Sequence, residues 1–362
     1  MVSIAMTILM AACSQENVED NQASQNLITF SVPDMLWNKA NTRAQVLGSI
    51  EDLKASTTEI RVTAKIHTDH SKVYINNERL QYLNNTWTLS KYVNNAWIAS
   101  KYYWLPNTPL DFFADVVSGN RTAFNSQVSN QTNYTFDYTV PTTIANQHDY
   151  VYAVSLNTQK SDDPIPLDFR HALSQIVFTA SVAENWYVEI KSITIHNISS
   201  TGTFSYETGL WTNLNAASTD YVFQLASAET FNGISAARRL QATDDERLVL
   251  MPQTLDSWSP KVGGVRVPIA TADAQNKSYV AIECKIKHPS EANYYAGTNT
   301  TYGTIYAPIS GTWEPNKIYI YELPFGYGYN ADGKPTIEQI TLSTTILDWT
   351  TGEIQSGNAE FD

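Results

Sequence analysis

The sequence has 362 residues, of which 43% are hydrophobic and 16% are charged, and its formal net charge at pH 7 is -13. The hydrophobic share excludes a disordered chain, and the length suits two domains of ordinary size. An acidic surface repels phosphate backbones and the sequence shows no basic stripe, which argues against nucleic-acid binding.

The N-terminus carries the pattern of a bacterial lipoprotein signal. An apolar run ends in Met10-Ala11-Ala12 immediately before Cys13. The signal peptidase needs small side chains before its cut, and the cysteine thiol then carries the lipid. The run is shorter than the roughly 20 apolar residues that span a bilayer, so residues 1–12 are expected to be a processed signal. No Lys or Arg precedes the run, and the alternative is a mildly apolar, disordered N-terminus.

A polar stretch at 13–26 reads as a tether and leads into a short alternating segment. Apolar and polar side chains alternate in this segment, which predicts a strand with one buried face; its residues are Leu27-Ile28-Thr29-Phe30-Ser31-Val32. The same alternation predicts further strands at 60–66, 110–117, 134–140 and 150–156.

A local repeat follows the first of these later strands. Asn84-Asn85 and Asn94-Asn95 each precede a similar Trp-containing segment. Asparagine tolerates the left-handed backbone of turns, so each copy is predicted to be a turn followed by a strand. The run Tyr102-Tyr103-Trp104 comes next, and it suits either a sugar-stacking platform or a set of core aromatics.

Polar residues and two prolines at 157–167 cannot continue a sheet interior, so we place a domain boundary there, with domains at 27–160 and 161–362. Many short alternating segments with turn signals between them predict an all-β fold of sandwiches or barrels. The best candidate for a short helix is the region from Ala226 to Leu240.

Cysteine and histidine give no sign of an active site. Cys284 lies on the apolar face of a predicted strand, which favours a buried core thiol. His171 stands among apolar residues, where a satisfied core-edge ring is expected. His67 and His70 hint at metal ligands, but three residues apart they fall on opposite faces of a strand, and no third ligand is close in sequence. We therefore expect no metal, no cofactor and no catalysis.

Several motifs, in their order and spacing, resemble the fimbrillins, the subunits of the type V pili of anaerobic Gram-negative bacteria. The matching pieces run through the whole chain and are the signal at Cys13, Ile28-Thr29-Phe30, Thr42-Arg43-Ala44, Tyr103-Trp104, Leu110-Asp111-Phe112-Phe113-Ala114, Gln147-His148-Asp149, Phe169-x-His171-x-Leu173-Ser174-Gln175-Ile176-x-Phe178, Leu250-Met251-Pro252-Gln253 and Trp313-Glu314-Pro315-Asn316-Lys317-x-Tyr319-x-Tyr321. The Phe-x-His-x-Leu-Ser and Trp-x-Pro-x-Lys-x-Tyr pieces are the most specific.

The resemblance implies two transthyretin-like Greek-key β-sandwich domains in tandem, export as an outer-membrane lipoprotein and assembly with other pilus subunits into a cell-surface fimbria. In shaft fimbrillins a trypsin-like protease cuts after an arginine and releases the first strand, whose groove a neighbouring subunit then fills. Carried over to this sequence, the strand is Leu27 to Val32 and the cleavage residue is Arg43. The alternative is that Arg43 is only a loop residue and the strand stays in place.

The C-terminus departs from the shaft pattern. A donor strand should alternate and carry apolar side chains, but after Trp349 only Ile354 and Phe361 are sizeable and apolar. The better alternation, at Ile340, Leu342, Thr344 and Ile346, is expected to belong to the domain's own last strand. A tip or accessory subunit, or an anchor, is therefore favoured over a shaft subunit.

The second functional hypothesis is a surface-anchored lipoprotein that binds a host or bacterial glycan or protein. Nine Trp and 21 Tyr offer ample stacking surface. The candidate stacking residues are Trp97, Tyr102, Tyr103 and Trp104.

Overall fold

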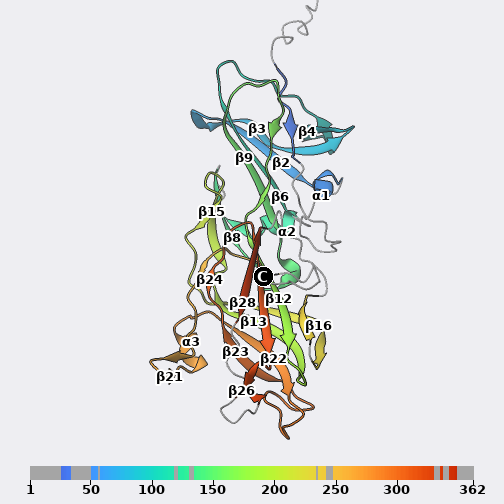
Figure 1. The fold of residues 1–362 in the computed structure, drawn as a ribbon. Helices are drawn as coiled ribbons and strands as arrows, with labels where there is room; N and C mark the ends of the chain where they lie inside the picture. Colours follow the sequence, from blue (N-terminus) through green and yellow to red (C-terminus); the bar gives the residue numbers. More distant parts are fainter. Residues whose placement is uncertain are drawn as a thin grey trace, which may run out of the picture.

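The computed structural model describes residues 26–33, 50–55, 58–117, 121–129, 134–233, 235–241, 248–329, 335–336 and 342–348 (Figure 1). Strands dominate this part of the chain, which confirms the predicted all-β fold. The helical elements within it are short: α1 (Ile50–Lys54), α2 (Arg121–Asn125), α3 (Ile269–Ala274) and the 3-10 turn η2 (Ile144–Asn146). None of the described helices is long and apolar enough to cross a membrane.

The first half forms a nine-stranded sheet, in the upper part of Figure 1. Its strands are β1 (Phe30–Ser31), β2 (Ile60–Ile66), β3 (Asp69–Leu83), β4 (Thr86–Val93), β5 (Ala96–Ala99), β6 (Leu110–Val117), β9 (Tyr150–Thr158), β10 (Ile165–Pro166) and β11 (Arg170–His171). They are ordered β10-β1-β4-β3-β2-β6-β9-β11, with β5 paired to β4. The strands predicted at 60–66, 110–117 and 150–156 are therefore found as β2, β6 and β9.

This sheet curls around its own core. Strands β1 and β6 are four positions apart in the sheet order, which in a flat sheet would separate them by about 19 Å. The rings of Phe30 and Phe112 nevertheless have centroids only 5.8 Å apart. Alternate residues of β2 and β6 face the same core, so the concave side of the sheet encloses one hydrophobic cluster. This burial is what fixes the register of the alternating strands.

The predicted asparagine turns are present. Asn84 and Asn85 have φ values of 50° and 62°, and Asn94 and Asn95 repeat the same pair of values. A turn with positive φ at both central residues suits the right-handed twist of a two-residue hairpin. Accordingly β3 pairs with β4 and β4 pairs with β5, both antiparallel, which gives the meander expected from the repeat.

Two sheets of the second half share one core. The five-stranded sheet contains β12 (Ser174–Val182), β17 (Ser235–Arg239), β18 (Leu248–Leu250), β25 (Lys317–Phe325) and β28 (Ser343–Asp348). The four-stranded sheet contains β13 (Tyr187–Ile198), β16 (Thr219–Asn232), β22 (Tyr279–Lys287) and β23 (Gly303–Pro308). Inward side chains of both sheets belong to the largest hydrophobic cluster, as a β-sandwich requires.

A further four-stranded sheet joins the two halves. It is formed by β7 (Val128–Ser129), β8 (Thr135–Thr139), β14 (Thr201–Ser205) and β15 (Leu210–Thr212), in the order β15-β14-β8-β7. Strand pairing thus crosses the expected boundary at 160, because β8 precedes it and β14 follows it. In addition, β10 and β11 follow the boundary yet pair within the first sheet. Three short ribbons complete the strands: β19 (Thr254–Leu255) with β24 (Gly311–Thr312), β20 (Lys261–Val262) with β21 (Val265–Arg266), and β26 (Gly328–Tyr329) with β27 (Pro335–Thr336).

The helix predicted between Ala226 and Leu240 is wrong. This region belongs to β16 and β17, which pair with β13 and β12 respectively. Phe231 is buried opposite Val188 on β13, so the cross-strand ladder continues through the alanine-containing stretch. Tertiary pairing overrides the local propensity here.

Candidate functional site

The segment predicted to be exchangeable lies inside the first sheet. Strand β1 sits between β10, which runs parallel to it, and β4, which runs antiparallel. It is therefore not an edge strand, because β10 occupies the edge of the sheet beyond it. Backbone bonds extend beyond β1 itself, since the Ile28 N–H donates to the Tyr102 carbonyl (2.8 Å) and the Ile165 N–H donates to the Thr29 carbonyl (2.8 Å).

Alternate side chains of this segment fill the core of the curled sheet. Ile28, Phe30 and Val32 are buried, while Leu27 is exposed. Burying three side chains of this size stabilises the fold by about 5–9 kcal/mol in all. A chain that lost this segment would expose both a hydrophobic trough and unpaired backbone groups on β10 and β4. Such a slot templates the addition of another strand.

Cys13 and Arg43, the predicted lipid-attachment and cleavage residues, lie outside the described residues. The same holds for the poor donor sequence after Trp349. The better alternation just before it behaves as predicted over part of its length, because β28 pairs antiparallel with β25 and is the last strand of its sheet. Ile340, the first residue of that alternation, lies outside the described residues.

Of the four candidate stacking aromatics, Trp104 occupies the core position that the sequence left open beside the stacking role. Its side chain is 2% exposed and its ring packs edge-on against Phe112, so neither face is open to a ligand. The hydroxyl of Tyr102 donates to Glu78, and its ring meets Tyr74. Tyr103 bridges to Leu27 through its backbone. These three residues therefore help to hold the Leu27–Val32 segment in the sheet more than they form an exposed stacking surface.

Trp97 is placed differently, because it lines an open pocket of about 420 Å³ with Glu59, Arg61, Arg79 and Tyr92. The guanidinium carbons of Arg61 and Arg79 lie 4.8 Å and 5.5 Å from the centroid of its ring. The ring of Tyr92, which is 61% exposed, lies 5.2 Å from that of Trp97. Two cations and two aromatic rings thus converge on one hollow of the surface. Arg61 also forms an ion pair with Glu59, which lines the same pocket, and donates to the Asn77 carbonyl (3.1 Å), so cation–π contacts and these bonds together fix its guanidinium.

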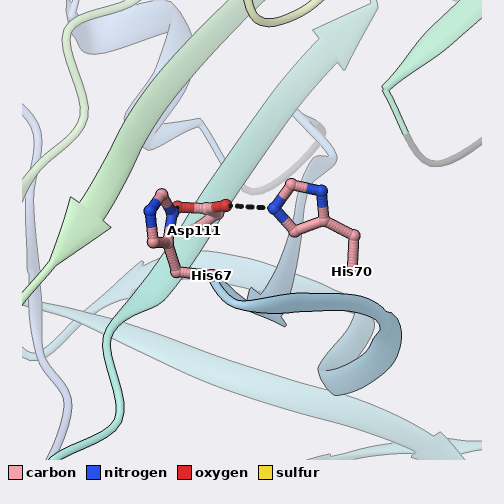
Figure 2. A group of neighbouring side chains, drawn as sticks. All are labelled: His67, His70 and Asp111. Atoms are coloured by element: carbon pink, nitrogen blue, oxygen red, sulfur yellow. Dashed lines mark hydrogen bonds and ion pairs between the residues drawn. The ribbon is translucent and has the colours of Figure 1, made fainter.

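A cluster of two histidines and one aspartate lies on the convex side of the same sheet (Figure 2). His67 Nδ1 is 2.8 Å from Asp111 Oδ1, and His70 Nε2 is 3.0 Å from Asp111 Oδ2. The cluster is not visible in the sequence for two reasons. A tight turn between β2 and β3 returns both histidines to one side, and the third member comes from β6, which is 41 residues beyond His70.

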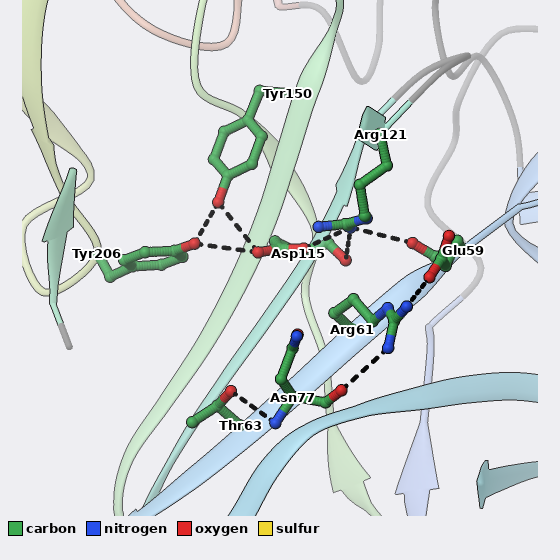
Figure 3. A network of polar contacts seen from close by, with 8 residues as sticks. All are labelled: Glu59, Arg61, Thr63, Asn77, Asp115, Arg121, Tyr150 and Tyr206. Atoms are coloured by element: carbon green, nitrogen blue, oxygen red, sulfur yellow. Dashed lines mark hydrogen bonds and ion pairs between the residues drawn. The ribbon is translucent and has the colours of Figure 1, made fainter. Parts of the chain in front are cut away.

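A polar network around Asp115, four residues beyond Asp111 on β6, tethers the two halves (Figure 3). Arg121 donates to Asp115 Oδ1 (2.6 Å), and Tyr206, which follows β14, donates to Asp115 Oδ2 (3.1 Å). Tyr150 and Tyr206 are hydrogen bonded through their hydroxyls. Burial, reinforced by the Asp115 carboxylate, raises the pKa of Tyr206 well above its usual value, so this hydroxyl remains a donor. The network gives the partly buried Asp115 carboxylate both a charged partner and hydrogen-bond donors, as a carboxylate in such a position requires.

Two further predictions from single residues are confirmed. The ring of His171 is buried and its Nδ1 lies 2.9 Å from Asp149 Oδ1, so it is a satisfied core histidine. Cys284 is fully buried on β22, and burial raises the pKa of its thiol to about 12. A thiol in this state is inert, because the thiolate is the reactive form.

Comparison with known proteins assigns this all-β chain to a family. The family model of fimbrillin-like proteins matches residues 42–349. The chain belongs to the fimbrillin-like family. No curated protein matches the chain.

Solved structures with a similar chain path carry related descriptions. A candidate cell adhesion protein of Bacteroides ovatus is 13% identical, with 90% of this chain and 97% of that chain covered and a TM-score of 0.42. A candidate cell adhesion protein of Parabacteroides distasonis is 11% identical, with 92% and 98% covered and a TM-score of 0.43. The C-terminally truncated tip fimbrial protein Mfa3 of Porphyromonas gingivalis is 12% identical, with 85% and 97% covered and a TM-score of 0.36.

Proposed function

We propose that this protein is a non-catalytic structural and adhesive subunit of a cell-surface fimbria, assembled by strand exchange after export as an outer-membrane lipoprotein. The observation that carries the proposal is the family membership of residues 42–349 together with the position of the Leu27–Val32 segment in the sheet. A segment bonded on both sides, with three side chains in the core, leaves a slot of defined register when it is removed.

Cleavage at Arg43 would detach this segment from the rest of the chain, because the described strands that continue the fold begin after it. The vacated slot would then accept a strand from a neighbouring subunit. The weak alternation after Trp349 favours a subunit that accepts a strand and donates a poor one. A tip or accessory role is therefore proposed in preference to a shaft role.

The test uses the full unlipidated chain and its Arg43→Ala variant, treated briefly with trypsin and followed by intact mass and native gels. We expect one early cut after Arg43 in the parent and none at that position in the variant. A cut without an oligomer ladder agrees with a tip or accessory subunit, and a ladder agrees with a shaft subunit. A chain that resists cleavage at Arg43 and stays monomeric contradicts strand exchange.

A synthetic peptide provides a matched control for the slot itself. A peptide copy of residues 26–33 should bind the cleaved chain and restore its thermal stability, because it offers the same three core side chains. A second peptide with serine in place of Ile28, Phe30 and Val32 keeps the backbone and should not bind. Equal effects of both peptides would show that backbone pairing alone is responsible and would argue against a specific slot.

The pocket at Trp97 favours glycan binding as a second candidate function. The rings of Tyr92 and Trp97 suit stacking on a sugar face. A carboxylate on that sugar can pair with the guanidinium groups of the lining in competition with Glu59, which already pairs with Arg61. Glycan-array binding should be lost in Trp97→Ala and in Tyr92→Ala. Tyr82→Ala is the matched control, since Tyr82 packs on Trp87 in the first copy of the repeat with the same centroid separation of 5.2 Å. If no acidic sugar binds the parent, the pocket has another role.

A further inference from the structure

The cluster of His67, His70 and Asp111 is built from three strands of the first sheet. His67 directly follows β2, His70 lies at the start of β3, and Asp111 lies at the start of β6. The His67 N–H donates to the Pro109 carbonyl (3.0 Å), which ties the turn between β2 and β3 to the chain leading into β6. The positions of the three side chains are therefore set by the sheet and not by a long loop.

The three side chains offer one ligand atom each within 4.8 Å of one another. In Figure 2 both imidazole rings point toward the Asp111 carboxylate, from opposite sides of it. Two ligands of a tetrahedral zinc ion, at about 2.0–2.1 Å from the metal, are about 3.3 Å apart. The observed separations of 2.8 Å and 3.0 Å between nitrogen and oxygen are close to this value, and side-chain rotations that bring the three ligand atoms closer than their present span of up to 4.8 Å would complete the coordination.

The carboxylate of this cluster is buried and oriented, whereas its two imidazole rings are partly exposed. The Asp111 carboxylate is 2% exposed, whereas the imidazoles of His67 and His70 are 38% and 40% exposed. Asp111 Oδ1 also accepts a hydrogen bond from the Asn157 N–H (2.7 Å), which orients the carboxylate. The ring of His70 packs on Tyr134, with centroids 4.5 Å apart. The carboxylate is thus buried and oriented beneath two partly exposed imidazole rings, of which His70 turns its Nε2 inward toward Asp111.

We propose that His67 Nδ1, His70 Nε2 and Asp111 bind one divalent transition-metal ion of the zinc class, with solvent in the fourth position. Imidazole and carboxylate ligands in this number suit Zn²⁺, and they suit Ca²⁺ or Mg²⁺ poorly because those ions prefer oxygen ligands only. The bound ion clamps the turn between β2 and β3 to β6. It does so at the junction of the two halves, because Tyr134 leads into β8 of the joining sheet.

The competing explanation is that the two imidazoles donate hydrogen bonds to Asp111 and nothing more. The two explanations differ in the effect of an amide at position 67. In His67→Gln the amide still donates to Asp111, but it is a poor zinc ligand. A hydrogen-bonding role is therefore preserved in this variant, and a metal-binding role is not.

The experiment titrates Zn²⁺ into the full unlipidated chain, without an affinity tag and after removal of bound metal by a chelator, and it follows the heat of binding. We expect one ion per chain and at least a tenfold loss of affinity in His67→Gln and in His70→Ala, since changes outside the ligand shell alone cost about 10- to 100-fold. His196→Ala is the matched control, because His196 Nδ1 lies 3.0 Å from Asp220 Oδ2 in a lone histidine–aspartate pair. The affinity of the His196→Ala variant for Zn²⁺ should equal that of the parent.

Two further measurements distinguish a loss of metal ligands from a loss of folded protein. Co²⁺ bound to the parent should give the intense visible absorption of a four-coordinate site, and the two variants should lack it. Thermal unfolding of the parent should shift upward with added Zn²⁺, while that of His67→Gln should not, although both unfold at similar temperatures without metal. Absence of saturable Zn²⁺ binding to the parent, or equal binding by the parent and both variants, would overturn the proposal.

Discussion

Asn316 is the residue at which the two most specific sequence motifs meet. Its side-chain oxygen accepts the His171 N–H (3.2 Å), and its own N–H donates to the Leu173 carbonyl (3.1 Å). Ser174 Oγ donates to the Glu314 carbonyl (2.8 Å) in the same contact. The Phe-x-His-x-Leu-Ser and Trp-x-Pro-x-Lys-x-Tyr pieces therefore lie against each other, far apart in sequence, and their specificity has a structural cause.

The backbone of Asn316 adds a second requirement, because its φ is 62°. Asn316→Gly keeps this conformation but leaves the buried His171 N–H without its acceptor, so we expect the free energy of unfolding to fall by about 1–3 kcal/mol. Asn316→Ala also strains the backbone and should cost about 1–2 kcal/mol more. Urea unfolding followed by tryptophan fluorescence measures both. Equal losses in the two variants would contradict a conformational role.

Some single-residue positions could be predicted from the sequence and others could not. The roles of His171 and Cys284 were predictable, because apolar neighbours at alternate positions identify a buried face. The burial of Trp104 was not, because an aromatic run reads the same on a surface or in a core. The proximity of Asp111 to His67 and His70 depends on the register between β2 and β6, which no local pattern encodes.

At the scale of elements, strand β1 is held in the sheet by the side chains on its buried face. Phe30 packs edge-on against Phe112, with centroids 5.8 Å apart, and it is buried. Phe30→Ala should lower the free energy of unfolding by about 3–5 kcal/mol, because it leaves a cavity in the core. Ser31→Ala, on the other face of the same strand, should change it by no more than about 0.5 kcal/mol. Comparable losses in thermal melts of the two variants would contradict the assigned register.

A cross-strand charge pair gives the sandwich a dependence on pH. Glu189 on β13 is opposite Lys285 on β22, and their charged groups are 3.2 Å apart. Hydrogen bonds from Tyr187 and Tyr302, together with Lys285, hold the pKa of Glu189 below its usual value. A carboxylate with a lowered folded pKa stabilises the fold above its unfolded pKa of about 4.3, and this contribution disappears as the pH falls through the folded value.

Glu189→Gln should therefore be less stable than the parent at pH 7, by up to about 1 kcal/mol, since the pair is only partly shielded from solvent. The difference should shrink steadily below about pH 4. Glu184→Gln, an exposed glutamate in the turn before β13, serves as the control. Thermal melts from pH 3 to pH 7 test this, and a difference that persists unchanged at low pH would refute it.

The elements themselves were the part of the fold most accessible from sequence. Asparagine pairs and alternating faces identified the meander of β3, β4 and β5, because both signals act over a few residues. The region from Ala226 to Leu240 was misassigned because its strand character comes from pairing with β13 and β12, which are distant in sequence. The predicted strand Leu27–Val32 was found in part, as β1 (Phe30–Ser31) with an isolated bridge at Leu27, but its place between β10 and β4 is a property of the whole sheet.

At the scale of the whole molecule, the two halves are connected more closely than a linker would allow. The joining sheet pairs β8 with β14, and the Asp115 network bonds Tyr206 to the first sheet (Figure 3). The polar, proline-containing stretch at 157–167 predicts a break in a strand, and the expected domain boundary rests on that break. Beyond position 160, β10 and β11 still pair within the first sheet, so strand pairing continues across the expected boundary.

The Asp115 network yields a prediction for this junction. Tyr206→Phe removes a donor from the partly buried Asp115 carboxylate at the junction, so we expect a loss of about 1–3 kcal/mol in the free energy of unfolding. Tyr221→Phe is the control, because its buried hydroxyl donates only to the neutral Val140 carbonyl (3.2 Å). It should cost about 0.5–1.5 kcal/mol. Urea denaturation of both variants measures the comparison, and a smaller loss for Tyr206→Phe would show that the network contributes little to the junction.

The double-sided pairing of β1 also has a mechanical consequence. A strand with backbone partners on both flanks carries tension applied along its length through all of its hydrogen bonds at once. Tension applied across an edge strand instead opens such bonds one after another. Resistance to pulling is governed by the rate of unfolding. The strand is therefore pulled out more slowly when all of its hydrogen bonds are loaded together than when they open one after another. A strand placed between β10 and β4 is thus suited to bear traction.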